Sequence, residues 1–304
     1  MIFRFGIVFL LSAYSALAYQ STNLAPVGAE PGTNIVYAKV GERELHINLV
    51  LPKKKPATPL PVIVWIHGGG FKIGDYTRNR AAWLAEHGYA AASVQYRFTD
   101  VAPLPTQVFD CKAAIRFLRA HAKQYGLDPN HIGVWGGSAG GHLAALVGTS
   151  GDVKELEGEL GNADQSSRVQ AVSPWYGLYD MTAGDKDRKK NPNKPEPFIE
   201  FLGGTFPEKR ELAKLVSAVT HASKDDPPFL IVHGEIDRTM PIRQGELLYD
   251  ALSKAGVDVT FIRVKNGNHN LTAADMEPNM DEIERRLLKF FDKHLKPQPK
   301  PTTK

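Results

Sequence analysis

Gly136-Gly137-Ser138-Ala139-Gly140 is the stretch from which the fold of this chain can be inferred. The apolar run 131–135 before it has the length of a strand, and the run 141–147 after it, rich in Ala and Leu, is typical of a helix. A serine between a strand and a helix, flanked by glycines, predicts a nucleophile elbow, a very tight turn that exposes the hydroxyl group. The turn also points the free N–H groups at the start of the helix toward any anion that forms there. The alternative is a glycine-rich turn that only packs closely.

Apolar runs of strand length alternate with helical patterns on both sides of this turn. The run 62–66 is continuously apolar, as expected for a strand that is buried on both faces. Alternation of this kind builds a parallel sheet covered by helices on both sides, so an α/β fold is predicted. We expect strands at 34–40, 43–51, 62–66, 89–96, 131–135, 169–176, 228–233 and 257–264, and helices at 79–87, 105–125, 141–147, 208–221 and 281–295.

Composition and charge narrow the classes of function. The chain has 304 residues and a net charge of +4. This is weakly basic, and no Lys/Arg stripe with interleaved aromatic residues is present, so no nucleic-acid partner is expected. The sequence contains no phosphate-binding loop, no dinucleotide fingerprint and no zinc-type spacing, so we expect no cofactor and no metal. The one cysteine, Cys111, shares an apolar helical face and is expected to be a small buried hydrophobe.

The first 18 residues have the pattern of a signal peptide. Arg4 precedes the apolar run 5–11, and Ala16-Leu17-Ala18 is a cleavage site of the A-x-A type. The apolar run is shorter than the roughly 20 residues that span a bilayer, so no stable membrane anchor is expected. We therefore expect export, to the periplasm or out of the cell, and a mature chain that begins at Tyr19.

The mature chain is expected to be one domain, residues 19–296, followed by a disordered polar tail at 297–304. One insert, 177–227, breaks the alternation of strands and helices, and its segment 185–195 is basic and interrupted by prolines. An insert of this length is either a lid over a site or an ordinary surface excursion, and we favour a small cap.

A serine hydroxyl becomes a good nucleophile only when a base takes its proton and a carboxylate fixes that base. In this architecture the acid and the base follow the serine in the chain, each at the carboxyl end of a later strand. Asp237 follows the strand 228–233, and His269 follows the strand 257–264. The carboxyl ends of parallel strands meet at one edge of the sheet, so Ser138, Asp237 and His269 are predicted to form a catalytic triad.

Other histidines and carboxylates compete for these roles. His142, one helical turn beyond the serine, is interpreted as a packing residue. His67, at the glycine run, and His233, at a strand end, are interpreted as residues that brace loops. His221, in the cap, is a second choice for the base. Glu235 and Asp180 compete with Asp237 for the acid.

The run His67-Gly68-Gly69-Gly70-Phe71 provides a place for an oxyanion. A tetrahedral intermediate needs two or three backbone N–H groups that already face it. The backbone at Gly69 and Gly70 is open to such an approach, and Ala139 offers a further N–H group. The alternative is a merely flexible glycine loop. Aromatic residues near these loops, Phe71, Trp175 and Tyr176, together with Tyr179, are candidates for the wall of a substrate pocket, with an ordinary core role as the alternative.

Together with Tyr96-Arg97 and His233-Gly234-Glu235-Ile236-Asp237, these motifs resemble the esterase/lipase branch of the α/β-hydrolase superfamily. The chain is most similar to bacterial feruloyl-esterase-like and acetyl-xylan-esterase-like proteins. The resemblance covers residues 36 to 295 and implies an eight-stranded, mostly parallel sheet and ester hydrolysis through an acyl-enzyme without a cofactor. By the same resemblance, the triad and the oxyanion residues are those named above. Hormone-sensitive-lipase relatives usually carry Asp at the position of Gly137, so the chain departs from that neighbouring group.

The expected substrate is an ester, either a small molecule or one linked to a polysaccharide. Aromatic walls suit a hydroxycinnamoyl group, such as feruloyl, or a sugar ring, and a crowded site favours short acyl chains over long ones. A secreted serine peptidase or amidase of the same fold and a non-catalytic binding module remain alternatives. The sequence does not indicate an oligomeric state.

Overall fold

The computed structural model describes residues 33–54, 56–183 and 199–296 of the chain. The predicted signal peptide, the polar tail and the basic stretch of the insert lie outside the described residues. The expectations for 1–18, 297–304 and 184–198 therefore remain predictions of the sequence.

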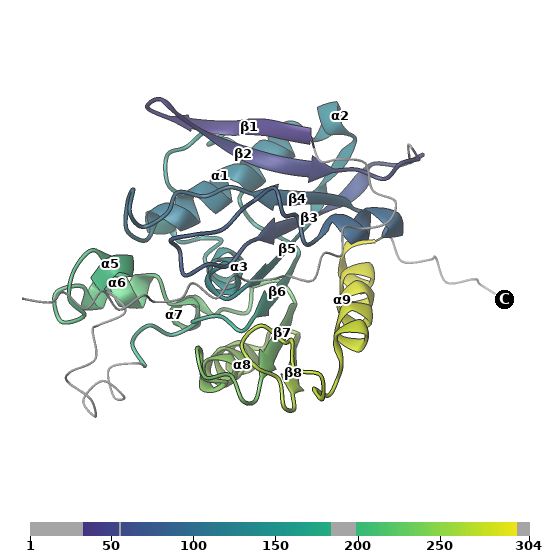
Figure 1. Ribbon diagram of the computed structural model, residues 1–304. Helices are drawn as coiled ribbons and strands as arrows, with labels where there is room; N and C mark the ends of the chain where they lie inside the picture. Colours follow the sequence, from purple (N-terminus) through teal and green to yellow (C-terminus); the bar gives the residue numbers. More distant parts are fainter. Residues whose placement is uncertain (1–32, 55, 184–198, 297–304) are drawn as a thin grey trace, which may run out of the picture.

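Within the described residues, eight strands form one mixed sheet in the order β1-β2-β4-β3-β5-β6-β7-β8 (Figure 1). The hairpin β1-β2 is antiparallel, and β2 pairs with β4 in the antiparallel sense; all later pairings are parallel. The prediction of an α/β-hydrolase fold with a mostly parallel sheet is confirmed. The strands are β1 (Thr33–Val40), β2 (Arg43–Val50), β3 (Leu60–Ile66), β4 (Ala90–Val94), β5 (Leu127–Gly137), β6 (Ala171–Trp175), β7 (Phe229–Gly234) and β8 (Val259–Val264).

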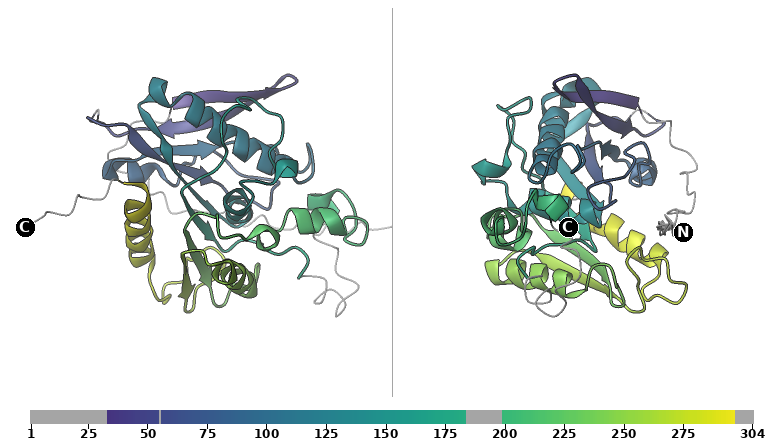
Figure 2. Two further views of the ribbon diagram at one scale, coloured as in Figure 1. Left: turned by 180° about the vertical axis from the view of Figure 1, so that it is seen from behind. Right: turned by 60° about the vertical axis from the view of Figure 1, so that its left-hand side comes forward.

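Helices cover both faces of the sheet (Figure 2). Side chains of α1, α3 and α8 join the core on one face, and side chains of η1 and α9 join the core on the other. None of the described helices is long and apolar enough to cross a bilayer. The helical elements are η1 (Ala82–His87), α1 (Thr106–Ala120), α2 (Ala122–Tyr125), α3 (Ala139–Thr149), η2 (Lys154–Leu156), α5 (Ile199–Leu202), α6 (Arg210–Leu215), α7 (Ala218–His221), α8 (Arg243–Ala255) and α9 (Met280–Leu295).

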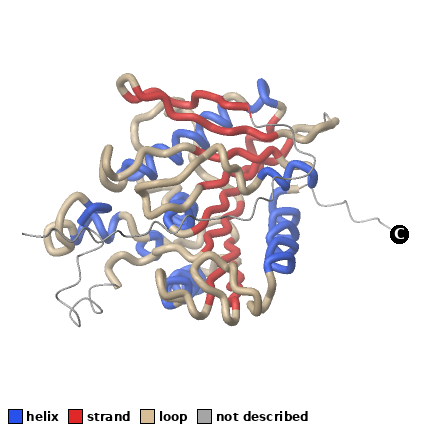
Figure 3. Tube along the Cα trace, in the orientation of Figure 1, coloured by secondary structure: helices blue, strands red, loops and turns tan. Residues whose placement is uncertain are grey.

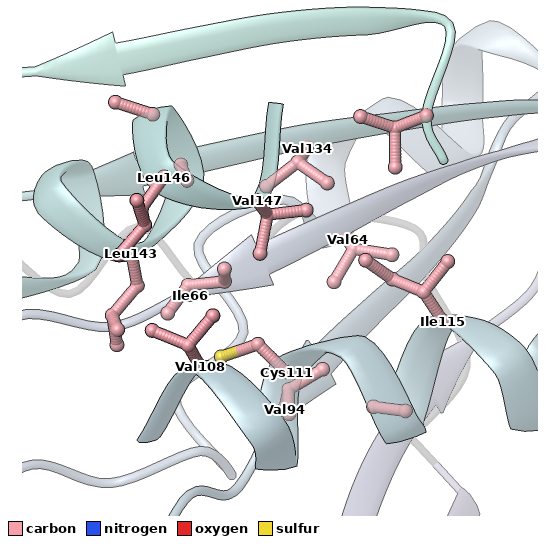
Figure 4. Close-up of a cluster of buried hydrophobic side chains, with 14 of the residues drawn as sticks. Val64, Ile66, Val94, Val108, Cys111, Ile115, Val134, Leu143, Leu146 and Val147 are labelled. Atoms are coloured by element: carbon pink, nitrogen blue, oxygen red, sulfur yellow. The ribbon is translucent and has the colours of Figure 1, made fainter. Parts of the chain in front are cut away.

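The central strand β3 shows why the sequence is continuously apolar here. Val62, Val64 and Ile66 belong to the core under α1 and α3, whereas Ile63 and Trp65 belong to the core under α9. Successive side chains of a strand point to opposite faces, so a strand buried on both faces needs an apolar residue at every position. Cys111 of α1 lies in the first core, beside Val94 and Val108, as Figure 4 shows, and the prediction of a buried hydrophobe is confirmed.

Several predicted elements have other bounds in the structure. The long helix expected at 105–125 is divided at His121 into α1 and α2. The first helix is a 3-10 helix of six residues, shorter than the expected 79–87. The strand before the elbow starts at Leu127 rather than 131, because Leu127 pairs with Leu60 across a register shift. Local propensity does not determine such ends, which depend on the neighbouring strand.

The excursion between β6 and β7 contains less helix than the sequence predicts. The single helix expected at 208–221 is two short helices, α6 and α7, and a further short helix, α5, precedes them (Figure 3). Helix α7 contacts α3 and α8, and its Val219 donates an N–H to the carbonyl of Tyr179, so this part of the excursion packs on the main domain. The cap role remains a prediction, because part of the segment lies outside the described residues.

The elbow is held against the sheet by backbone contacts that exclude side chains. A Cβ at Gly140 would lie 2.0 Å from the carbonyl oxygen of Ile66, and a Cβ at Gly136 would lie 2.2 Å from that of Gly140. Both distances are far shorter than any van der Waals contact. The first turn of α3 therefore approaches β3 at a distance that only glycine allows.

We expect Gly140→Ala to destabilise the protein by at least about 3 kcal/mol, because the new methyl group meets backbone rather than a movable side chain. Gly126→Ala is the matched control. Gly126 has a left-handed φ of 69°, and a Cβ there meets nothing within 4 Å. That variant should lose only the roughly 1–2 kcal/mol that a left-handed alanine costs. Urea unfolding of both variants measures the difference, and equal losses would contradict this account of the elbow.

Candidate active site

Three loops at the carboxyl edge of the sheet bring the predicted triad together. Ser138 follows β5, Asp237 follows β7 and His269 follows β8, and these strands lie within four neighbouring positions of the sheet. The Nε2 atom of His269 is 3.0 Å from the hydroxyl oxygen of Ser138, and its Nδ1 atom is 2.7 Å from Oδ2 of Asp237. One imidazole therefore connects the hydroxyl and the carboxylate with hydrogen-bond geometry at both ends.

Ser138 has the strained backbone of a nucleophile elbow. Its φ and ψ are 56° and −121°, which a non-glycine residue adopts rarely, at a cost of about 1–3 kcal/mol. The turn is held by its neighbours, since the N–H of Ser138 donates to the carbonyl of Trp175 at 3.0 Å and the N–H of His142 donates to the carbonyl of Ser138 at 3.0 Å. A Cβ at Gly137 would lie 2.8 Å from the hydroxyl oxygen of Tyr176. Because residue 137 is a glycine, the side chain of Tyr176 can lie against the elbow.

Asp237 is buried and its carboxylate is fully engaged. Its Oδ1 atom accepts hydrogen bonds from the N–H groups of Thr239 and Met240, at 2.9 and 2.8 Å, and Oδ2 faces His269. Burial raises the pKa of this carboxyl group, but the hydrogen bonds of His233, His269 and the backbone outweigh burial and hold the pKa well below its ordinary value. The group is therefore a carboxylate at any pH at which the protein functions.

The loops that carry the acid and the base are joined by their backbones. The N–H of Ile236 donates to the carbonyl of Gly267 at 3.1 Å, and the N–H of Glu235 donates to the carbonyl of Val264 at 2.9 Å. A Cβ at Gly234 would lie 2.1 Å from the carbonyl oxygen of Gly267, so the two loops cross at a glycine. This crossing fixes the distance between the acid and the base.

The glycine run lies beside the nucleophile. A Cβ at Gly68 would lie 3.2 Å from the Cβ of Ser138, and Gly69 and Gly70 have φ values of 113° and 61°. Among the described residues, the N–H groups of Gly69, Gly70 and Ala139 have no acceptor. The carbonyl of Gly69 accepts from Lys72 and Ile73, which closes the loop and leaves its N–H groups open. The glycine run thus touches Ser138 through Gly68, and the N–H groups of the predicted oxyanion donors are not occupied by described protein groups.

The other histidines have structural partners. The ring of His67 stacks on Tyr96 with centroids 4.4 Å apart, and its Nδ1 atom lies 2.7 Å from the carbonyl oxygen of Gly68. His142 is buried in α3, where burial lowers its pKa to about 4, so the ring is neutral. His221 makes its contact inside the excursion, 2.6 Å from the carbonyl oxygen of Leu215. None of these three imidazoles is paired with Ser138 in the structure.

The competing carboxylates lie elsewhere. Glu235 is exposed and forms an ion pair with Arg263 at 3.4 Å. Asp180 closes its own turn, accepting from the backbone of Thr182 and Ala183. Neither carboxylate contacts His269.

Of the aromatic residues expected at the pocket, Tyr176 and Phe71 lie by the site. The ring of Tyr176 is 5.2 Å from that of His269, edge to face. Phe71 directly follows the oxyanion glycines and packs on Phe201 at 5.1 Å. Both side chains are almost fully buried, at 3% exposure each, so they bound the site from beneath rather than line an open groove.

The prediction that Trp175 lines the pocket is wrong. Its side chain has no exposed surface and belongs to the core on the α9 side of the sheet. The indole ring packs on Trp135 at 5.0 Å and donates its N–H to the hydroxyl of Ser173, while the guanidinium of Arg80 lies over it at 5.1 Å. Trp175 and Tyr176 both contribute to this core, but β6 ends at Trp175, and Tyr176, which follows with a φ of 37°, has its ring against His269.

Two contacts of the site were not anticipated in their present form. His233 lies against Asp237 as well as bracing its loop, with Nε2 at 3.3 Å from Oδ2. Gly68, rather than the two glycines after it, makes the close approach to Ser138. The position of His233 four residues before the acid was a signal for the first contact, but spacing alone does not show which way a ring is turned.

Comparison with known proteins places this site in a family. The sequence matches the BD-FAE family over residues 47–252, a range that contains the elbow, the glycine run and the acid. The chain belongs to the BD-FAE family. The base, His269, lies beyond the matched range, and its assignment rests on the geometry.

Relatives of this BD-FAE chain are esterases. "Esterase LipQ" of Mycobacterium tuberculosis is 30% identical over 244 residues, which cover 78% of this chain and 56% of that protein. "Probable carboxylic ester hydrolase LipM" of the same organism is 34% identical over 63% of this chain and 44% of that protein. This chain thus spans about half the length of these curated relatives.

Solved structures agree with this assignment. A structure described as a truncated form of a carbohydrate esterase from gut microbiota superposes with a TM-score of 0.74 and 31% identity, covering 88% of this chain and 98% of its own. Esterase 2 of Thermogutta terrifontis superposes with a TM-score of 0.70 and 28% identity, over 86% of this chain and 93% of its own.

The arrangement in this BD-FAE chain is suited to acyl transfer. It combines a hydroxyl, an imidazole, a fixed carboxylate and free N–H groups for a developing anion. In the described residues, no group of three or more His, Cys, Asp or Glu side chains could hold a metal ion.

We expect the acid limb of the pH profile to report one ionisation. Because the pKa of Asp237 is held well below its ordinary value, the carboxylate stays charged on acidification and adds no ionisation of its own to this limb. The logarithm of kcat/KM for an ester should then fall with unit slope as the pH falls. A slope of two, with circular dichroism unchanged over the range, would mean that the carboxyl group titrates together with the imidazole and would contradict the assigned hydrogen bonds.

Proposed function

We propose that the protein is a serine carboxylic-ester hydrolase that acts through an acyl-enzyme. The observation that carries this proposal is the single imidazole of His269 between the hydroxyl of Ser138, at 3.0 Å, and the carboxylate of Asp237, at 2.7 Å. Membership of the BD-FAE family and the esterase relatives support it.

In the first half of the reaction, Oγ of Ser138 forms a bond to the carbonyl carbon of the ester as Nε2 of His269 takes the hydroxyl proton. The electron pair of the carbonyl double bond moves to its oxygen, and the N–H groups of Gly69, Gly70 and Ala139 stabilise that oxyanion. When the carbonyl re-forms, the bond to the alkoxy group breaks and the leaving alcohol takes the proton from His269. Asp237 stabilises the imidazolium throughout and does not itself take up a proton.

In the second half, a water molecule takes the place of the alcohol. His269 removes a proton from this water as its oxygen bonds to the acyl carbon, and the same N–H groups stabilise the second oxyanion. The intermediate then releases the carboxylic acid as Ser138 regains its proton from His269. The protein groups that transfer the proton or face the developing charge therefore have positions that the fold has already fixed.

For the substrate, we propose short acyl esters or hydroxycinnamoyl esters, such as those on plant cell-wall polysaccharides. The aromatic pair Phe71 and Phe201 lies directly behind the oxyanion loop and limits room for a long acyl chain. Tyr176, edge to face with His269, supplies an aromatic surface beside the nucleophile. A carbohydrate esterase among the structural relatives is consistent with a sugar-linked ester, and Thermogutta terrifontis esterase 2 has been solved with propionate and with butyrate.

A secreted peptidase or amidase of the same fold is the second candidate, because amides yield to the same groups. A non-catalytic binding module is the third, and the alignment of hydroxyl, imidazole and carboxylate argues against it, since binding alone does not require that alignment. A p-nitroanilide with the same acyl group as an active p-nitrophenyl ester separates the first two candidates directly. We also propose, from the pattern of the first 18 residues, that the chain is exported. Polysaccharide esters of the cell wall occur outside the cell, so export and this substrate class agree.

We expect kcat/KM on p-nitrophenyl esters to be highest for acetyl to butyryl and to fall steeply from decanoyl onward. Methyl ferulate and acetylated xylan, measured in the same series, distinguish a hydroxycinnamoyl preference from an acetyl preference. Phe201→Ala should raise the rate on octanoyl relative to acetyl esters by about tenfold, because one aromatic wall, half-buried in the structure, is removed. A maximum at dodecanoyl in the wild type would contradict the proposed acyl site.

Phe206→Ala is the matched control for this variant. Phe206 is a fully buried phenylalanine of the same excursion, and the guanidinium of Arg210 lies over its ring at 5.1 Å. Its loss should lower the melting temperature without changing the preference for acyl length. If both variants change the preference for acyl length equally, the effect comes from loosening of the excursion and not from loss of the aromatic pair Phe71 and Phe201.

A further inference from the structure

His233 is a second imidazole in contact with the catalytic carboxylate. It lies in β7, four residues before Asp237, and its side chain is fully buried. The Nε2 atom is 2.8 Å from the carbonyl oxygen of Met240 and 3.3 Å from Oδ2 of Asp237. The ring therefore touches the acid loop at its start and at its end.

The partners of the two ring nitrogens determine where the proton of His233 is. The Nδ1 atom is buried and, within the described part of the chain, has no hydrogen-bond partner. A proton on Nδ1 would be a buried donor without an acceptor, which is costly, whereas a proton on Nε2 has the carbonyl of Met240 and the carboxylate in front of it. These contacts assign the donor N–H of the ring to Nε2.

The carboxylate of Asp237 is thus surrounded on both oxygens. Oδ1 accepts the two backbone N–H groups of Thr239 and Met240, and Oδ2 lies between the imidazoles of His269 and His233. Met240 connects the two halves of this arrangement, because its N–H donates to Oδ1 while its carbonyl oxygen accepts from His233. A shift of the His233 ring would therefore move the loop that holds the acid.

We propose that His233 is a positioning residue for the triad, which fixes Oδ2 of Asp237 for His269 and withdraws part of its negative charge. This inference rests on the proposed function, since it assigns the acid a partner for that reaction. His233 does not touch the reacting atoms and acts only through Asp237. Among the described residues, the other titratable groups that face the carboxylate are His269 and the buried phenol of Tyr179, whose own pKa is raised by burial and by Asp237. From α8, the residue against the ring is Gly245, which carries no charge.

The test compares two substitutions of His233. His233→Leu fills the space and removes the N–H group, whereas His233→Gln places an amide N–H close to the position of Nε2. For the leucine variant we expect kcat on p-nitrophenyl acetate to fall about tenfold with KM within twofold of the wild type, as for the loss of one hydrogen bond to a charged group. The glutamine variant should recover most of kcat.

The pH profile separates positioning from simple stability. Without the N–H of His233, more negative charge on Asp237 faces His269, so the imidazolium persists to higher pH and the acid limb of kcat/KM should move up by about half a unit. His46→Leu is the control: His46 also lies in a strand and bonds to a polar partner, Gln95, but far from the triad in the sheet order. It should lower the melting temperature without moving the acid limb.

Two results would overturn the assignment. One is a leucine variant with the kcat and the acid limb of the wild type; the other is a glutamine variant that is no more active than leucine at equal melting temperature. Wild-type hydrolysis in the same assay distinguishes either failure from failure of the proposed function. The low-field proton resonance of the bond between His269 and Asp237 gives a readout that needs no substrate. It should be present in the wild type and the glutamine variant and broadened or shifted in the leucine variant, and an unchanged resonance in the leucine variant would contradict the proposal.

Discussion

The close approach of backbone to backbone at the elbow is the constraint on which the rest of the site depends. The first turn of α3 lies so near β3 that a methyl group at Gly140 would overlap the carbonyl of Ile66. This contact holds Ser138 at a φ of 56°, a conformation that the chain would not adopt unless its surroundings imposed it. The hydroxyl is thereby held next to the glycine loop, and the start of α3 supplies an N–H group at the same place. The conformation of the elbow and the placement of the Ser138 hydroxyl both depend on glycines at positions where no side chain fits.

A second glycine contact does the same for the acid and the base. Gly234 and Gly267 cross where β7 and β8 end, so Asp237 and His269 are positioned by backbone hydrogen bonds rather than by long flexible side chains. The carboxylate is buried, which alone would favour its neutral form, and the surrounding donors keep it charged. The imidazole that must bear a positive charge during the reaction therefore has a fixed anion beside it. Electrostatic preorganisation of this kind needs no rearrangement when charge develops.

Much of this arrangement was predictable from the sequence. The glycine-flanked serine, the order of acid and base and the strand before each determine which loops meet, because carboxyl ends of parallel strands share an edge. The structure brings Ser138, Asp237 and His269 together, and their catalytic roles stay predictions that the geometry supports. The direction of side chains was harder to infer. Trp175 and Tyr176 are neighbours in the sequence, yet one lies in the core under Arg80 and the other lies against His269. The excursion 177–227 was predicted least well, because short helices without a strong apolar pattern take their ends from tertiary contacts.

Covalent labelling with a p-nitrophenyl phosphonate tests the central claim most directly, since the phosphonyl group bonds to an activated serine and mimics the tetrahedral intermediate. The account predicts one phosphonyl group per chain on the peptide that contains Ser138, with an equal amount of p-nitrophenolate released. Ser138→Ala should take up no label, and His269→Gln should be labelled far more slowly while its fold is unchanged. Labelling of another residue, or a rate in His269→Gln equal to that of the wild type, would contradict the account.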